Sequence, residues 1–362
     1  MLHADQLPGR TLLAADGRQY LFCSGTGYLG IARNPAFAEL LAEGLARYGT
    51  NYSSSRNSSL QLRIYDEAEQ YLARYTGAEA SLTVSSGYLA GQMAVKALAR
   101  AGRFEYAPGT HPAAWLADHP ALVGAARTFD EWAQHLLHRL HHEAPHPVVI
   151  VSNSLDALRV QRYNFGWAQE LPTDRPVTLL IDDSHGFGLI GRGGAGIFTE
   201  VQVPASVRLV VVSSLGKACG IPGGVVLGDA SFVGSLRRSA FFAASSPVVP
   251  AYLYAFVHAQ ALYQQARQQL ATNVQRFAEA APAALFQGAE GFPVFYTPAN
   301  SLADYLQQRE VLISSFPYPA PTDLCITRVV LSALHTPADV EGLASLTTDF
   351  ARQQIYDELK GN

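Results

Sequence analysis

The sequence predicts an α/β protein: a large domain with a mainly parallel sheet between helices, then a smaller α+β domain. Short, β-branched apolar runs alternate along the chain with helical patterns, which is typical of parallel sheets. The runs are almost continuously apolar, as expected for strands that are buried on both faces. The predicted strands are residues 80–86, 104–108, 148–154, 177–183, 209–214 and 223–229.

Helical patterns precede and separate these strands, and the pattern changes after residue 250. The first two predicted helices end at Gly49 and Gly77, as glycine commonly ends helices. We therefore expect an N-terminal arm and helix (1–49), a large domain (50–268) and a small domain (269–362). The predicted helices are 35–49, 66–77, 88–102, 129–142, 251–282, 301–308 and 337–360, and the late strands are 292–298, 310–316 and 324–333.

Composition excludes several classes of protein. The chain has 362 residues, of which 48% are hydrophobic and 15% charged, so it is long and apolar enough for sizeable cores. A net charge of −4 argues against nucleic acid as a partner. Three widely spaced cysteines (Cys23, Cys219 and Cys325) favour free thiols in a reducing compartment. No apolar run approaches the roughly 20 residues of a membrane span, and no signal peptide is recognisable, so we expect a cytoplasmic protein without membrane contact.

A lysine at the end of a buried strand is the most informative single residue. Residues 209–214 lead directly into Lys217, and Gly216 and Ala218 beside it leave room for a bulky ligand. Burial lowers the pKa of a lysine and frees its lone pair, as Schiff-base chemistry requires. The alternative is an ordinary lysine in an exposed loop, and this segment alone favours neither interpretation.

Two other strand ends carry polar groups that suit the same chemistry. Residues 177–183 deliver Asp182, and His185 follows three positions later. A buried carboxylate needs a partner, and the protonated pyridine nitrogen of pyridoxal 5'-phosphate (PLP) is one. Ser86 and Gly87 stand where residues 80–86 lead into a helix, whose first amides form a seat for phosphate. Both segments have ordinary alternatives as helix N-caps.

Six segments, in this order, resemble the α-oxoamine synthases, a family of PLP-dependent enzymes with fold type I. The resemblance covers most of the chain. It implies a large domain with a mainly parallel, seven-stranded sheet, a homodimer, and PLP as cofactor. The segments are YLGIARNP (28–35), YGTNYSSSR (48–56), TGAEASLTVSSGY (76–88), IDDSHGFGLIGRGGAG (181–196), SSLGKACG (213–220) and TRVVLSALHTPADVEGL (327–343).

The resemblance also implies a role for each matching residue. Lys217 matches the Schiff-base lysine, Asp182 the partner of the pyridine nitrogen, and His185 the histidine at the ring hydroxyl. His111 matches the histidine that stacks on the ring, and Arg328 the arginine that binds the substrate carboxylate. The other matches are Ser86, Gly87, Tyr88 and Ser214 at the phosphate, Ser154 at the ring oxygen, Ser245 or Ser246 at the phosphate from the neighbouring subunit, and Thr26 at the substrate.

The family's substrate positions are altered more than its cofactor positions. Thr26 replaces a substrate-facing asparagine, and residues 50–55 depart from the family's glycine-rich segment. Ala244 stands where the neighbouring subunit's phosphate-binding threonine belongs, so Ser245 or Ser246 would have to substitute for it.

Three other interpretations have less support. GRGGAG (191–196) matches a dinucleotide-binding pattern but follows no strand directly, so we interpret it as a tight glycine turn. The histidines between His135 and His146 include a pair with zinc-ligand spacing, His138 and His142, but no acidic ligand matches them, and we predict no metal. A Ser-His-Asp hydrolase is disfavoured, because the sequence has no G-x-S-x-G motif around a candidate serine nucleophile.

The sequence thus favours a PLP-dependent acyltransferase that condenses a small amino acid with an acyl thioester, with loss of carbon dioxide. The thioester is carried by coenzyme A or by a carrier protein. A class I/II aminotransferase is the alternative, because it needs the same lysine, aspartate and phosphate seat. His111 favours the acyltransferase, since aminotransferases more often stack an aromatic ring on the cofactor. A non-catalytic PLP-binding protein ranks last, because Lys217 is intact and no DNA-binding domain is present.

Overall fold

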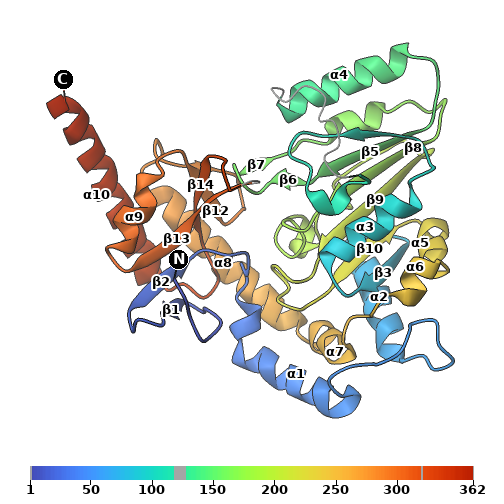
Figure 1. Cartoon of the computed structure of the whole chain (residues 1–362), viewed down its shortest axis with the longest axis horizontal. Coiled ribbons are helices and arrows are strands. Elements are labelled where there is room, and N and C mark those ends of the chain that lie inside the picture. Colours follow the sequence, from blue (N-terminus) through green and yellow to red (C-terminus); the bar gives the residue numbers. More distant parts are fainter. Residues whose placement is uncertain (1, 118–127, 319–320, 362) are drawn as a thin grey trace. The chain divides into compact units, whose positions relative to one another are not determined.

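The computed structural model of the protein describes residues 2–117, 128–318 and 321–361, and Figure 1 shows its helices and strands. The chain divides into two compact units. The larger contains Pro35–Asp156 and Arg162–Gln260, and the smaller contains Met1–Asn34, Ala157–Gln161 and Ala261–Asn362. The first helix therefore belongs to the larger unit, and that unit ends at Gln260, eight residues before the end of the predicted large domain.

One mainly parallel sheet forms the centre of the larger unit, and all six strands predicted for it are present. In the order β3-β10-β9-β8-β5-β4, strands β4, β5, β8 and β9 are parallel, and β10 is antiparallel to both its neighbours. The described residues therefore hold six of the seven strands that the family resemblance implies. The strands are β3 (Ala80–Val84), β4 (Arg103–Tyr106), β5 (Val148–Asn153), β8 (Val177–Asp182), β9 (Val207–Ser214) and β10 (Gly224–Gly228).

Helix α3 (Gly87–Ala97) shows how this unit forms its core. The Ser86 hydroxyl caps the helix by accepting from Leu89 N (3.1 Å), and Ala90, Met93 and Ala94 recur at helical spacing on its buried face. That face packs on β3, β9 and β10, as Figure 1 shows. The other helices of the unit are α1 (Pro35–Tyr48), α2 (Arg63–Thr76), η2 (Pro112–Ala114), α4 (Phe129–His142), η3 (Gly166–Glu170), η4 (Arg192–Gly194), α5 (Ala230–Arg237), α6 (Ala240–Ala244) and α7 (Pro250–His258).

The smaller unit has a six-stranded sheet of its own, in the order β1-β2-β13-β14-β12-β11. Its first two strands form an N-terminal hairpin that was not among the predicted strands. Asp16-Gly17 makes the turn, with Gly17 at φ 85°, so a recognised hairpin signal was present in the sequence. The elements are β1 (Thr11–Leu13), β2 (Gln19–Cys23), η1 (Ile31–Arg33), α8 (Gln260–Ala280), β11 (Gln287–Gly288), β12 (Val294–Thr297), α9 (Ser301–Gln307), β13 (Val311–Pro317), β14 (Cys325–Val330) and α10 (Pro337–Gly361).

The single long helix predicted over 251–282 is wrong, because the chain breaks it into α7 and α8. Ala259 leaves the helical conformation (φ −93°, ψ 17°). The Gln260 side chain donates to Phe256 O (2.7 Å) and accepts from the Tyr71 hydroxyl, so polar contacts of this side chain stabilise the break.

Within the described parts of the chain, no helix is long and apolar enough to cross a bilayer. Two short strands, β6 (Leu155–Asp156) and β7 (Gln161–Arg162), lie on either side of residues 157–160.

A buried ion-pair network anchors the segment before α2 to the sheet. The two terminal guanidinium nitrogens of Arg56, Nη1 and Nη2, donate to the Glu69 carboxylate (2.9 and 3.2 Å), and both side chains are almost fully buried. Glu69 also accepts from Thr83 N (2.9 Å) and from Arg237 (2.6 Å). Its pKa is lowered, because the hydrogen bonds and charges of these partners together outweigh the effect of burial. The network therefore fixes β3, whose carboxyl end leads to Ser86 and Gly87.

We predict that the Glu69→Ala substitution lowers the free energy of unfolding by about 3–5 kcal/mol, because it leaves the Arg56 charge buried without its partner. Denaturant unfolding followed by circular dichroism measures the change. The Arg162→Ala substitution is the control, since it removes an ion pair with Glu200 whose side chains are 45% and 36% exposed, and we expect no measurable change. Equal effects of the two substitutions would contradict the assigned role of the network.

Candidate cofactor site

The carboxyl ends of three adjacent parallel strands bring polar groups to one edge of the larger sheet. Asn153 of β5 is in register with Asp182 of β8, and Asp182 is in register with Val212 of β9. The backbone pairing continues past the strand ends, because Ser154 N donates to Asp182 O (2.9 Å). Ligands of parallel sheets bind at such ends, so this edge is the candidate site.

Asp182 and His111 face each other at this edge. The Asp182 carboxylate is buried and accepts from Ser184 N (2.9 Å), and its Oδ2 lies 4.0 Å from His111 Nδ1. His111 Nδ1 accepts from Ala113 N (3.2 Å), so a neutral ring carries its proton on Nε2. The pKa of His111 is lowered, mainly by burial and further by the Lys217 charge, while Asp182 opposes the shift. The lowered pKa favours the uncharged ring, in which Nε2 is the donor.

Lys217 interacts electrostatically with the carboxylates of Asp182 and Asp183. Burial lowers its pKa, whereas the charges of Asp182 and Asp183 raise it, and burial dominates. The lysine follows β9 after the short turn Leu215-Gly216, in which Gly216 N donates to Ser214 Oγ (3.1 Å). A lysine with a lowered pKa at the end of a buried strand is the group that Schiff-base formation needs.

The N-terminus of α3 lies against the turn that precedes Lys217. A Cβ atom on Gly87 would stand 2.5 Å from Ser214 Cβ, and one on Gly224 would stand 2.2 Å from Ser86 O. Only glycine allows this approach of α3 to the ends of β9 and β10. Ser184 Oγ adds a bond by accepting from Ser214 N (2.9 Å). The first amides of α3, which have no partner within a helix, thus lie beside the Ser214 hydroxyl and form an anion seat.

The remaining predicted residues of the larger unit differ in burial. Ser154 is buried and His185 is half-buried in the turn after Asp182, whereas the Tyr88 side chain is 59% exposed. Ser245 Oγ donates to Phe242 O (2.9 Å) at the end of α6, and Ser246 is exposed.

Arg328 and Thr26 belong to the smaller unit. Arg328 lies on β14, is buried, and donates through Nη1 to Ala157 O (2.6 Å). Its guanidinium also lies 5.5 Å from the Phe316 ring centroid. Thr26 is half-buried in the turn before η1.

Three residues of the edge were not among the predicted site residues. Asn153 accepts from His111 N (3.1 Å) and donates to Gly109 O (2.7 Å), so it holds the loop that carries His111. Ser184 Oγ accepts from Ser214 N, and Asp183 follows Asp182 in the chain and is buried. All three stand at strand ends where the sequence predicts chemistry, and polarity at such an end is the signal that could have found them.

The donor set of this edge fits PLP. Lys217 has the lowered pKa that a Schiff base requires, Asp182 is a carboxylate that can keep a pyridine nitrogen protonated, and His111 presents an uncharged ring. The glycine cradle at the start of α3 supplies the phosphate seat. These groups lie within one unit and on neighbouring elements.

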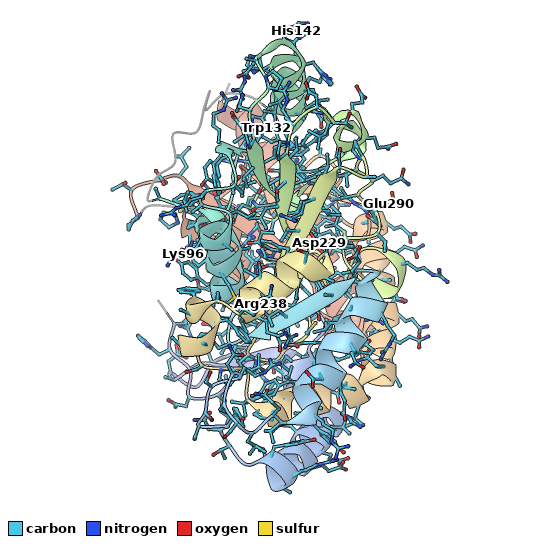
Figure 2. The ribbon with its side chains drawn as sticks, turned by 90° about the vertical axis from the view of Figure 1, so that its right-hand side faces the viewer. Lys96, Trp132, His142, Asp229, Arg238 and Glu290 are labelled. Carbon is cyan, nitrogen blue, oxygen red and sulfur yellow. The ribbon has the colours of Figure 1, made fainter. Side chains whose placement is uncertain are left out.

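Two other predicted features have structural explanations. GRGGAG forms a glycine turn around η4, with Gly191 and Gly196 at φ 74° and 79°, as predicted. The His138 and His142 rings stack at 4.2 Å, and His142 Nδ1 lies 2.7 Å from His138 O. Figure 2 shows His142 at the outer end of α4 and Trp132 nearer the sheet. Within residues 2–117, 128–318 and 321–361, no group of three side chains is arranged to hold a metal.

Comparisons with known proteins show what this chain is similar to. Residues 169–345 match the family model of class I and II aminotransferases. The chain is 32% identical to an 8-amino-7-oxononanoate synthase of Aromatoleum aromaticum over 62% of this chain and 58% of that protein. It is 28% identical to the enzyme of that name in Nitrosomonas europaea, over 97% of this chain and 94% of the other. The chain thus spans about six tenths of the first relative and nearly all of the second.

The fold is that of a solved serine palmitoyltransferase from S. paucimobilis with bound PLP. The two structures superpose with a TM-score of 0.79 at 16% identity, over 98% of this chain and 92% of the other. Fold and site together define a fold-type-I, PLP-dependent transferase. The relatives named as 8-amino-7-oxononanoate synthases confirm the resemblance to the α-oxoamine synthases that was found in the sequence.

We predict that the Gly87→Ala substitution weakens PLP binding about tenfold or more, because the added methyl group would displace the start of α3 from Ser214. Alanine is intrinsically better than glycine in a helix, so a loss would be steric rather than a matter of helix propensity. Titration of the apoprotein with PLP, followed by absorbance, measures the affinity. Gly342→Ala on α10 is the matched control, since no atom lies within 4 Å of its Cβ position. Unchanged affinity of Gly87→Ala would contradict the phosphate seat.

Proposed function

We propose that the protein is a PLP-dependent acyltransferase that condenses a small amino acid with an acyl thioester, with loss of carbon dioxide. The observation that carries the proposal is the position of the His111 ring at this edge, where its Nδ1 lies 4.0 Å from Asp182 Oδ2. Aminotransferases of this fold more often place an aromatic ring at that position. The relatives named as 8-amino-7-oxononanoate synthases support the same choice.

Each side chain at the edge of the larger sheet has a distinct task in this reaction. PLP, when bound, supplies an electron sink for the bond that breaks at the amino acid's Cα. Asp182 keeps the pyridine nitrogen protonated. Lys217 would hold the cofactor, and its amine would remove the Cα proton of the amino acid as a general base, for which its lowered pKa suits it. His111 donates from Nε2 and orients the acyl carbonyl.

The other predicted residues bind and position. We assign the start of α3, with Ser86, Gly87 and Tyr88, together with Ser214, to the phosphate. His185 and Ser154 are assigned to the ring oxygen. Arg328 is assigned to the substrate carboxylate, which suits its forked guanidinium, and Thr26 to the remainder of the substrate.

The substrates are proposed only by class. Thr26 and residues 50–55 differ from the family pattern, so we do not transfer the substrates of any relative. The acyl donor is a thioester of coenzyme A or of a carrier protein. A homodimer, with Ser245 or Ser246 reaching the neighbouring subunit's phosphate, and a cytoplasmic location remain predictions from the sequence.

The main test is thiol release. The PLP-loaded protein is incubated with a panel of acyl-coenzyme A thioesters and with glycine, alanine or serine. We expect thiol release that depends on the amino acid and is abolished by Lys217→Ala. Conversion of the cofactor to its amine form without thiol release would instead support the aminotransferase.

The His111→Ala substitution tests the assigned position of the ring. We expect the rate of acyl transfer to fall about a hundredfold, because the acyl carbonyl loses its orienting donor, while PLP still binds. The rate of α-proton exchange of the amino acid into deuterated water should fall much less, since Lys217 performs that step. Equal losses in both rates would contradict a role of His111 toward the acyl donor.

A further inference from the structure

A second aspartate, Asp183, lies directly behind the cofactor edge and has no role in the mechanism above. Its side chain is 1% exposed. Its backbone is held on both sides: Asp183 N donates to Val212 O (2.8 Å), and Asp183 O accepts from Gly186 N and Phe187 N (3.0 and 2.9 Å). The residue therefore starts the turn that carries His185.

The Asp183 carboxyl fills a space that two glycines leave open. A Cβ atom on Gly186 would stand 2.2 Å from Oδ1, and one on Gly196 would stand 2.2 Å from Oδ2. Oδ2 accepts from Ile197 N (2.9 Å), whereas Oδ1 is buried without a hydrogen-bond partner among the described residues. This side chain thus ties the turn at residues 183–187 to the end of the glycine turn.

The surroundings of this carboxyl favour its neutral form. Burial is the main cause, and the charges of Asp182 and Glu200 act in the same direction. The Ser154 hydroxyl and the Ile197 amide oppose them, and the balance raises the pKa of Asp183 to about 7. Lys217, on the turn after β9, is the facing cation, and an ionised Asp183 raises its pKa.

We propose that Asp183 is a positioning residue of the cofactor site: its carboxyl, which fills the space beside Gly186 and Gly196 and accepts from Ile197 N, fixes the turn that carries His185. The proposal rests on the PLP site of the proposed function, but not on acyl transfer. It predicts that the site responds to pH through a group that touches neither cofactor nor substrate.

Thermal unfolding of the apoprotein between pH 5 and pH 8 tests the charge state. Where the folded protein holds a proton that the unfolded chain releases, stability falls as pH rises, and the fall ends above the folded pKa. We expect the melting temperature of the wild type to fall more over this range than that of Asp183→Asn, which has no proton to lose. The other titratable groups of the site are the same in both proteins, so the difference between the two curves reports Asp183.

Asp174→Asn is the matched control for this experiment. Asp174 is an exposed acid of the same unit, and its pKa is lowered by Arg175, so it stays ionised from pH 5 to pH 8. The pH dependence of its melting temperature should equal that of the wild type. A curve for Asp183→Asn parallel to the wild type would overturn the proposal.

The bound cofactor provides a second readout. We expect the pH midpoint of the cofactor's absorbance to be lower in Asp183→Asn than in the wild type, because the Lys217 nitrogen loses a nearby negative charge. The asparagine should retain PLP binding. Asp183→Ala should weaken it, because alanine leaves Ile197 N without its acceptor and leaves the space beside Gly186 and Gly196 empty. Equal absorbance midpoints in Asp183→Asn and the wild type, or equal PLP affinities in the two variants, would overturn the proposal.

One measurement needs no variant and keeps the proposal testable if the substitutions prevent folding. The amide resonance of Ile197 in the wild-type apoprotein should shift with a midpoint near pH 7, since this amide donates to the titrating carboxyl. A shift that is absent between pH 5 and pH 8 would overturn it. Because no amino acid or thioester is present in any of these experiments, failure of the proposed acyl transfer would be seen separately.

Discussion

The burial of charge at the end of β8 is the constraint on which the rest of the site depends. Asp182 and Asp183 stand side by side in the chain, both buried, and Lys217 is the cation coupled to both. Buried carboxylates are unfavourable unless they are paired or protonated. The two aspartates meet this constraint differently, since Asp182 faces the cofactor edge with His111, whereas Asp183 fills the space beside Gly186 and Gly196.

The same constraint explains why glycines gather in this part of the chain. Gly186 and Gly196 leave the volume that the Asp183 carboxyl occupies, and Gly87 and Gly224 let α3 approach the ends of β9 and β10. Side chains at these positions would separate the phosphate seat and the carboxylates from Lys217. Sites of this kind need groups held to within a fraction of an ångström, and close backbone contacts provide that rigidity.

The sequence predicted the larger sheet well because its strands are continuously apolar and its helices are clearly amphipathic. It predicted Lys217, Asp182 and Gly87 as site candidates because ligands of such sheets bind at the carboxyl ends of the strands. The family resemblance added His111. It missed the β1–β2 hairpin despite Asp16-Gly17, and it merged α7 with α8. The break at Ala259 depends on contacts of Gln260 with Tyr71, nearly 190 residues away, which no local pattern records.

The role of Asp183 depends on the same kind of distant contact. Adjacent aspartates in a strand point to opposite faces, so the sequence separates Asp182 from Asp183 but does not say what Asp183 meets. Only the fold brings Gly196 and Ile197 to its carboxyl across the glycine turn. The sequence thus identifies which groups can react. The fold decides which of them are charged, and the charge of Lys217 determines whether it can act as a base at neutral pH.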